Sequence, residues 1–229
     1  SAAGHKAGVI GTISYRIGNR VIPATNTTPG PVELFGFMGE MAKSGSDYLV
    51  MEVSSHALDQ NRTGGVSFDA AVFTNLTGDH LDYHKTMEEY FKAKSRLFSG
   101  LRDDAHAVIN IDDEWGRRLI KASGGKALTY GTKLVADFLA TDIALTLDGT
   151  RFTVNHPGGR FGVDSRLIGM HNVYNMTAAA ACCIGLGLPA DRVKRGIEAL
   201  GAVPGRLEPV ECGQPFKVFV DYAHTDDAL

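Results

Sequence analysis

The sequence predicts an α/β fold in which helices wrap a mostly parallel sheet, with a smaller antiparallel sheet flanking it. Short apolar runs such as Tyr48–Met51 and Ala70–Phe73 have the length and composition of buried strands. They alternate with segments of helical periodicity, such as Val32–Lys43 and Met87–Phe98. Strand, helix and strand in turn are typical of a parallel sheet covered by helices. Further along, extended segments follow one another without a helix between them, which indicates antiparallel pairing.

The remaining elements are predicted from the same patterns, taken along the chain. The first helix follows the turn-forming string Asn26–Gly30, and the third begins with Asp112 and two further acidic residues, which stabilise a helix N-terminus. The alanines from Ala178 to Ala181 let a later helix approach its neighbours closely. The predicted strands span residues 7–15, 48–51, 70–73, 105–111, 127–130 and 216–220, and the predicted helices span residues 32–43, 87–98, 112–122, 171–185 and 189–200.

The antiparallel part is predicted between residues 138 and 168. Residues 138–155 alternate in polarity on both sides of the tight-turn dipeptide Asp148-Gly149, and residues 159–168 add a further extended segment. We expect these segments to form a second sheet beside the parallel one, within a single domain.

The composition excludes several classes of protein. With 44% hydrophobic and 21% charged residues the chain has the composition of a globular protein, and no apolar run approaches the roughly 20 residues that span a bilayer. The 23 basic and 26 acidic residues nearly balance, so the net charge gives no indication of a nucleic-acid partner. Cys182 and Cys183 are adjacent in an apolar helix and fit neither a disulfide framework nor a zinc site. We expect a cytoplasmic protein with reduced thiols and no signal peptide at Ser1.

Acidic and imidazole side chains follow two of the predicted strands. Glu52 comes directly after Tyr48–Met51, and the cluster Asp79, His80, Asp82 and His84 lies a few residues after Ala70–Phe73. Open α/β sheets bind their ligands at the carboxyl ends of the strands, so a functional site is expected there. Two other interpretations stay open for the cluster. It could be ordinary loop polarity and helix capping, or the four side chains could form the metal site of a hydrolase that needs no ATP.

Three segments carry a resemblance to a known family. The strings VMEVSSHALDQNR (50–62), FTNLTGDHLDYH (73–84) and YFKAKSRLF (90–98) resemble the central domain of the Mur ligases, and the similarity continues in order over nearly the whole chain. It implies a central ATPase domain over residues 1–214, truncated at its N-terminus, and the truncated start of the C-terminal ligase domain over residues 215–229. The phosphate-binding motif G-x-x-x-x-G-K-[ST] of that P-loop-type fold does not occur in the sequence, and we expect the chain alone to be inactive.

The resemblance also implies an activity. Mur ligases are ATP-dependent amide ligases of peptidoglycan synthesis, and hence of cell-wall biogenesis, cell shape and cell division. The string MEVSSHALDQNR resembles the corresponding segment of one branch of the family. Enzymes of that branch add meso-diaminopimelate or L-lysine to UDP-MurNAc-L-Ala-D-Glu through an acyl phosphate. We expect a monomer that binds these substrates with ATP and Mg²⁺, and neither nucleic acid nor membrane. A non-catalytic module that binds the UDP-sugar without ligation remains an alternative.

Three residues are implied at the catalytic centre by the same resemblance. Glu52 and His80 would bind magnesium, and Lys94 would be carbamylated by carbon dioxide. Carbamylation converts the cation into an anion, which could help to hold a metal that an ammonium group would repel. Oxygen ligands suit magnesium, whereas a histidine ligand is less typical.

Further residues are implied at the two substrate sites. Arg62 suits a carboxylate or phosphate because its guanidinium group can donate two parallel hydrogen bonds. Two asparagines one helical turn apart in the HNxxN string could read the edge of a purine. The residues implied at the UDP-sugar site are Thr27, Thr28, Ser54, Gln60 and Arg62, and those implied at the nucleotide are Asn172, Asn175, Arg206, Asp221 and His224.

Overall fold

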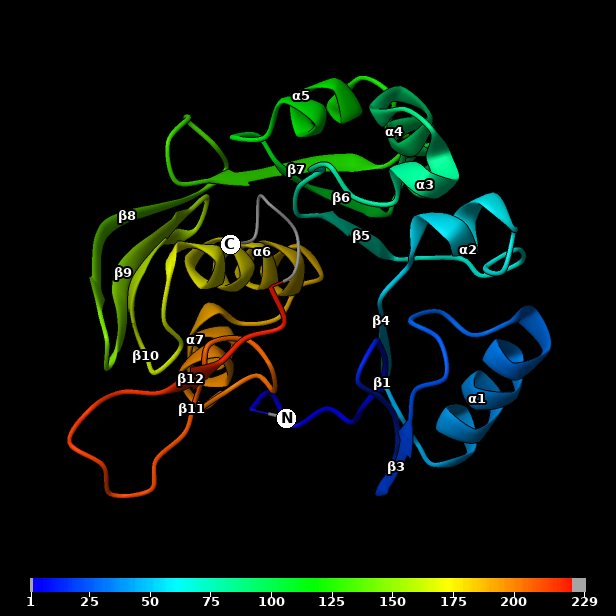
Figure 1. The fold of residues 1–229 in the computed structure, drawn as a ribbon. Helices are drawn as coiled ribbons and strands as arrows, with labels where there is room; N and C mark the ends of the chain where they lie inside the picture. Colours follow the sequence, from blue (N-terminus) through cyan, green and yellow to red (C-terminus); the bar gives the residue numbers. More distant parts are fainter. Residues whose placement is uncertain (1, 224–229) are drawn as a thin grey trace.

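The computed structural model describes residues 2–223 and shows a mixed α/β fold built on two main sheets (Figure 1). The larger sheet has the strand order β10-β9-β8-β7-β6-β5, and the smaller one has the order β3-β2-β1-β4. A two-stranded ribbon, β11-β12, completes the described part of the chain. The predicted fold class is therefore confirmed, although the antiparallel strands predicted to form a second sheet belong to the larger one.

The larger sheet contains the strands that were predicted to form two sheets. Its strands are β5 (Ala70–Phe73), β6 (His106–Asn110), β7 (Lys126–Gly131), β8 (Phe138–Thr146), β9 (Gly149–His156) and β10 (Gly159–Ser165). From β5 to β8 the pairing is parallel, and from β8 to β10 it is antiparallel. The separate antiparallel sheet predicted for residues 138–168 is thus wrong. The long strand β8 pairs with β7 through its first residues and with β9 over most of its length, and an irregularity between Thr141 and Ala144 interrupts its register with β9.

The smaller sheet is mainly antiparallel and is formed by the N-terminal part of the chain. Its strands are β1 (Ala7–Ile10), β2 (Ser14–Ile17), β3 (Arg20–Pro23) and β4 (Tyr48–Met51). Only the β1–β4 pair is parallel. The single strand predicted for residues 7–15 is wrong, because the chain turns back after Ile10 and again at Gly18. Gly18 has φ = 57°, as the two-residue turn between β2 and β3 requires, and the Gly-Asn dipeptide is the signal that the prediction overlooked.

All five predicted helices are present, and the prediction missed two short ones, α2 and α3. The helices are α1 (Pro31–Lys43), α2 (Ser55–Asp59), α3 (Leu81–His84), α4 (Met87–Ser99), α5 (Glu114–Ile120), α6 (Met170–Gly185) and α7 (Ala190–Glu198), and the final strands are β11 (Glu208–Pro209) and β12 (Phe219–Val220). The α5 helix starts later than predicted because Asp113 caps it by accepting hydrogen bonds from the backbone of Trp115 and Gly116. None of the helices between residues 2 and 223 is long and apolar enough to cross a membrane.

The hydrophobic core lies on both faces of the larger sheet. The α6 helix packs along one face against β6 to β9, and its buried alanines allow the close approach that the sequence predicted. Helices α4 and α5 cover the other face (Figure 1). Because side chains alternate along β6, Val108 packs in the core on the α6 side of the sheet and Ile109 packs in the core on the side of α4 and α5. Both side chains are completely buried. The Tyr130 hydroxyl donates to the Phe73 carbonyl oxygen at 3.0 Å and so ties β7 to β5 across the sheet.

A pair of valines tests this description of the core. Val154 is 0% exposed and Val135 is 93% exposed, so the same truncation to alanine removes buried contacts in one case only. We expect Val154→Ala to lower the free energy of unfolding by about 2 kcal/mol, through lost apolar burial and a residual cavity. Val135→Ala should change it by less than about 0.5 kcal/mol. Urea unfolding followed by circular dichroism measures both, and equal losses would contradict the assignment of Val154 to the core.

Candidate functional site

The carboxylate of Glu52 is held at the carboxyl end of β4 by residues that follow β1. Its oxygen Oε2 accepts hydrogen bonds from the backbone N–H of Thr12 at 3.2 Å and from the Thr12 hydroxyl at 2.5 Å. A Cβ atom at Gly11 would lie 2.9 Å from Glu52 Oε1, so a larger residue there would make the carboxylate move from this position. Sequence reasoning missed Gly11 and Thr12. Both residues come directly after β1, which runs parallel to β4. A position directly after a strand is also what pointed to Glu52, so the same signal could have found them.

Lys94 is an unusual lysine, because its amine is half-buried and unpaired. Within residues 2–223, its Nζ atom has no hydrogen bond or ion pair and lies 5.7 Å from the centre of the Tyr90 ring. Burial lowers the pKa of Lys94, and the carboxylates of Asp79 and Glu52 are close enough to oppose that shift. On the same helix, Lys92 is exposed and pairs with Glu89 at 2.6 Å, which raises the pKa of Lys92. The amine of Lys94 is therefore uncharged more often than that of its neighbour.

A small cavity adjoins the Lys94 side chain. It has a volume of about 50 Å³ and lies between the ends of β4 and β5 and the α4 helix. Val53 lines it from the β4 side, and Thr74 and Asn75 line it from the β5 side. The polar residues that follow both strands thus reach the same space as Lys94, as expected for the carboxyl edge of an α/β sheet.

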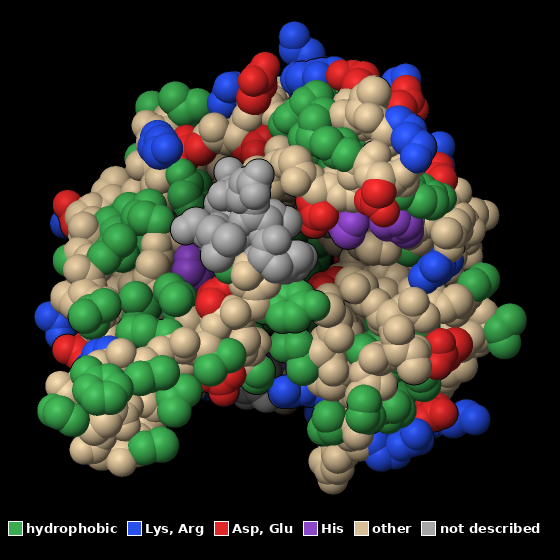
Figure 2. Space-filling view, in the orientation of Figure 1, with side chains coloured by type: hydrophobic (Ala, Val, Ile, Leu, Met, Phe, Trp, Pro, Cys, Tyr) green, Lys and Arg blue, Asp and Glu red, His purple; other side chains and the backbone are tan. Residues whose placement is uncertain are grey.

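His80 adopts a strained backbone conformation beside this site. Its φ of 57° lies in the left-handed region, which is uncommon for a residue with a side chain. Asp79 Oδ1 accepts a hydrogen bond from the His80 backbone at 2.7 Å, and the imidazole Nε2 lies 3.6 Å from Asp79 Oδ2. The ring centres of His80 and His56 are 5.0 Å apart. Figure 2 shows histidine side chains gathered beside acidic ones on this face of the molecule.

Thr28 joins the predicted substrate residues at the exit of β4. Its side chain is 0% exposed, and its hydroxyl donates to the Glu52 carbonyl oxygen at 2.8 Å and accepts from the Ser54 backbone N–H at 3.0 Å. Arg62 Nη1 in turn donates to the Thr28 carbonyl oxygen at 2.9 Å. The Thr28 hydroxyl is therefore occupied within the protein and inaccessible to a ligand.

The other predicted substrate residues lie around this network. Arg62 Nε donates to Gln60 Oε1 at 2.9 Å, and the hydroxyls of Thr27 and Thr12 are hydrogen-bonded at 3.1 Å. Ser54 caps α2, because its hydroxyl accepts the backbone N–H of the third residue along the helix at 3.1 Å. The five residues come from two separate segments, and hydrogen bonds connect both segments to the end of β4.

The predicted nucleotide residues lie around the start of α6 and the β11–β12 ribbon. Asn172 is buried and its Nδ2 donates to the Ile168 carbonyl oxygen at 2.9 Å, whereas Asn175 is exposed. The two amides therefore differ in accessibility, although they are one turn apart. Asp221 accepts the backbone N–H groups of residues 207 and 223, and these bonds, followed by the charges of Arg206 and His171, keep the pKa of Asp221 low. His224 lies outside the described residues.

The four residues of the hydrolase alternative do not converge on one point. Asp82 is exposed, whereas His84 is buried and its Nε2 lies 2.8 Å from the Ser55 hydroxyl. Across residues 2–223, no group of three or more histidine, cysteine, aspartate or glutamate side chains is placed to hold a metal ion. The geometry therefore gives the hydrolase alternative no support.

A known family matches most of this chain. Residues 1–183 match the model of the Mur ligase middle domain. The chain belongs to the Mur ligase family. Two similar relatives are named UDP-N-acetylmuramoyl-L-alanyl-D-glutamate–2,6-diaminopimelate ligase. The relative from Solibacter usitatus (strain Ellin6076) is 47% identical over 100% of this chain and 47% of its own length, and the relative from Geobacter sulfurreducens (strain ATCC 51573 / DSM 12127 / PCA) is 46% identical over 100% of this chain and 46% of its own.

Solved structures of Mur ligases share the fold. A structure of UDP-N-acetylmuramoyl-L-alanyl-D-glutamate–2,6-diaminopimelate ligase superposes with a TM-score of 0.85 at 34% identity, over 98% of this chain and 46% of that one. MurF from Acinetobacter baumannii superposes with a TM-score of 0.73 at 20% identity, over 95% of this chain and 45% of that one, and shows the fold alone. The chain thus spans about half the length of the Mur ligases that it matches.

The buried hydroxyl of Thr28 gives a stability prediction. Thr28→Val keeps the shape of the side chain but leaves the Glu52 carbonyl oxygen and the Ser54 N–H without their partner, which should cost about 1–3 kcal/mol of unfolding free energy. Thr28→Ser keeps the hydroxyl and removes one methyl group, so it should cost about 1 kcal/mol. Urea denaturation of both variants distinguishes the two effects. A serine variant as unstable as the valine variant would show that the hydrogen bonds contribute little.

Proposed function

We propose that this chain is the central domain of an ATP-dependent ligase that adds 2,6-diaminopimelate to UDP-MurNAc-L-Ala-D-Glu. The observation that carries the proposal is the half-buried Lys94 amine, which has no hydrogen bond or ion pair among residues 2–223. It lies within electrostatic range of Glu52, at the strand ends where α/β enzymes bind ligands. The names of the relatives support diaminopimelate rather than lysine as the amino acid. The domain would extend to residue 214, with residues 215–229 opening the next domain, and the enzyme would act as a cytoplasmic monomer.

Lys94 would react with carbon dioxide to complete a magnesium site. An ammonium group and CO₂ give a carbamate and two protons, and the neutral amine that burial favours is the form that attacks the carbon. The adjoining cavity of about 50 Å³ offers space beside the amine. The carbamate would add an oxygen ligand to the Glu52 carboxylate and the His80 imidazole, and oxygen is what magnesium prefers. Magnesium bound there would neutralise charge on a transferred phosphoryl group.

The two substrates would occupy the two sides of this centre. Thr27, Ser54, Gln60 and Arg62 would contact the UDP-sugar dipeptide, and Thr28 would hold their backbone in place through its buried hydroxyl. Asn175, Arg206, Asp221 and His224 would contact the nucleotide, with Asn172 fixing the start of α6 through its bond to Ile168. The terminal substrate carboxylate would take the γ-phosphoryl group of ATP to give an acyl phosphate and ADP. The amine of the diamino acid would then attack the acyl carbon and release phosphate.

Titration calorimetry with UDP-MurNAc-L-Ala-D-Glu tests the substrate site. We expect saturable binding to this chain, weakened roughly 10- to 100-fold by Arg62→Ala, because a hydrogen bond to a charged group contributes about 1.5–3 kcal/mol. Arg160→Ala is the matched control, because Arg160 is exposed on β10 in the other main sheet, and it should leave the affinity unchanged. Equal affinities for all three proteins would exclude Arg62 from the site. Binding without ligation by a longer form of the protein would instead support the non-catalytic module.

Labelling with ¹³C-bicarbonate tests the modification of Lys94. We expect a carbamate resonance that disappears in Lys94→Arg and persists in Lys92→Arg, because the pKa is lowered at Lys94 and raised at Lys92. At constant dissolved CO₂ the signal should grow as the pH rises, since each carbamate formed from the ammonium form releases two protons. A resonance that survives Lys94→Arg would contradict the assignment.

A further inference from the structure

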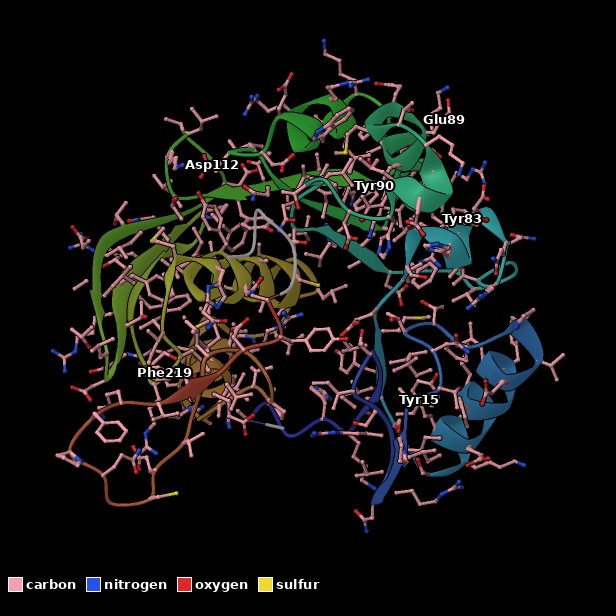
Figure 3. All side chains as sticks on the ribbon, in the orientation of Figure 1. Tyr15, Tyr83, Glu89, Tyr90, Asp112 and Phe219 are labelled. Atoms are coloured by element: carbon pink, nitrogen blue, oxygen red, sulfur yellow. The ribbon has the colours of Figure 1, made fainter. Side chains whose placement is uncertain are left out.

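We propose that His84 and Tyr90 are positioning residues that hold the three segments carrying Glu52, His80 and Lys94 in one arrangement. This inference rests on the proposed function, and it assigns a task to a buried cluster of rings that contacts no proposed substrate residue through its hydrogen bonds. The cluster lies where α2, α3 and α4 meet, and Figure 3 labels its Tyr90 ring together with the exposed Tyr83 beside it.

The first link is a buried hydrogen bond between α3 and the start of α2. His84 Nε2 lies 2.8 Å from the Ser55 hydroxyl, and the two residues are 7% and 1% exposed. Ser55 lies three residues after Glu52, and His84 lies four residues after His80. One short bond, shielded from water, therefore fixes the segment that carries His80 against the segment that carries Glu52. Breaking a buried hydrogen bond is costly, because water cannot reach the two groups to replace the lost partner.

The second link is the Tyr90 ring on α4. It stacks on His84 with the ring centres 5.1 Å apart and the planes 14° apart. The same ring meets His80 edge to face at 5.8 Å, and the Lys94 amine lies 5.7 Å from its centre. Tyr90 thus contacts two of the three proposed metal-site residues, His80 and Lys94. Because it also stacks on His84, it links the position of α3 to that of Lys94 on α4.

The Tyr83 ring also packs edge to face on His84 at 4.8 Å, but its exposed hydroxyl provides a matched comparison. The Tyr83 hydroxyl donates to Asp59 Oδ2 at 2.8 Å, and Arg96 Nη1 donates to Asp59 Oδ1 at 3.0 Å. All three side chains are exposed, so water can replace these bonds when they are removed. The Tyr83–Asp59 bond joins the same two helices as the His84–Ser55 bond, and the Arg96–Asp59 bond joins α4 to α2. Neither bond involves Lys94 or His80.

Loss of the buried link should therefore loosen the site while the sheet stays intact. Without the Ser55 bond, α3 and α4 can shift relative to the end of β4, and the distances from Glu52 to His80 and Lys94 are no longer defined. Residues that orient metal ligands from behind commonly change metal affinity 10- to 100-fold when mutated, although they do not touch the ion. The expected defect is therefore in carbamate content and in metal affinity.

Two readouts on this chain test the proposal: the ¹³C-carbamate signal of Lys94, and Mn²⁺ affinity from paramagnetic broadening of the His80 ring resonances. We expect His84→Phe, which keeps the stacking and removes the Ser55 bond, to weaken Mn²⁺ binding roughly 10-fold or more and to reduce the carbamate signal. Ser55→Ala should do the same, and the double variant should be no worse than either single one. Tyr90→Leu should reproduce the defect, Tyr90→Phe should be silent, and the control Tyr83→Phe should leave both readouts unchanged.

The outcomes separate this inference from the proposed function. Suppose that the chain without substitutions shows the carbamate signal and Mn²⁺ binding, and that His84→Phe and Ser55→Ala retain both. The positioning role is then wrong while the proposed function stands. Equal losses in Tyr83→Phe would also overturn it, since any disturbance of the junction would then suffice. If the unmodified chain shows neither signal, the proposed function fails and the inference fails with it. Because His84→Phe alters a buried site, circular dichroism melting accompanies each measurement, and Ser55→Ala serves as the milder variant.

Discussion

The burial of the Lys94 amine, which has no hydrogen bond or ion pair to any of residues 2–223, is the constraint on which the rest of the site depends. A charged ammonium group that is partly removed from water is destabilised, and in this chain burial accordingly lowers the pKa of Lys94. The carboxylates of Asp79 and Glu52 act in the opposite direction from a distance, without forming an ion pair with it. The lowered pKa favours the neutral, nucleophilic form of the amine, and a small cavity lies beside it.

The fold produces this environment by ending two strands at the same place. The segment after β4 carries Glu52, the segment after β5 carries His80, and the α4 helix brings Lys94 back over both. Glycine at position 11 and the buried hydroxyl of Thr28 allow the backbone after β1 and β4 to approach closely enough to fix Glu52. These contacts fix Glu52 at the strand end, whereas the positions of His80 and Lys94 also depend on how α3 and α4 pack there.

Much of the fold was predictable because its longer elements have clear periodicity, as in α1, α4 and α6. The helices α2 and α3 have five and four residues, too few for a period to be recognised, yet they carry His56, Ser55 and His84. The pairing of β8 with both β7 and β9 depends on contacts between strands far apart in the sequence, which the alternation of residues 138–155 cannot specify. The candidate residues at strand ends, such as Glu52, were predicted from their positions, but the burial of Thr28 and Asn172 could not be predicted. Their hydroxyl and amide bond to backbone groups whose positions only the folded chain defines.

A crystal structure of this chain grown with bicarbonate and Mn²⁺, with diffraction data collected at the manganese absorption edge, tests the central claim most directly. The account predicts extra density on Lys94 Nζ and an anomalous peak within coordination distance of that carbamate, Glu52 and His80. An unmodified Lys94 together with a manganese peak bound elsewhere, or a metal held by Asp79 and Asp82 with Lys94 turned away, would contradict it.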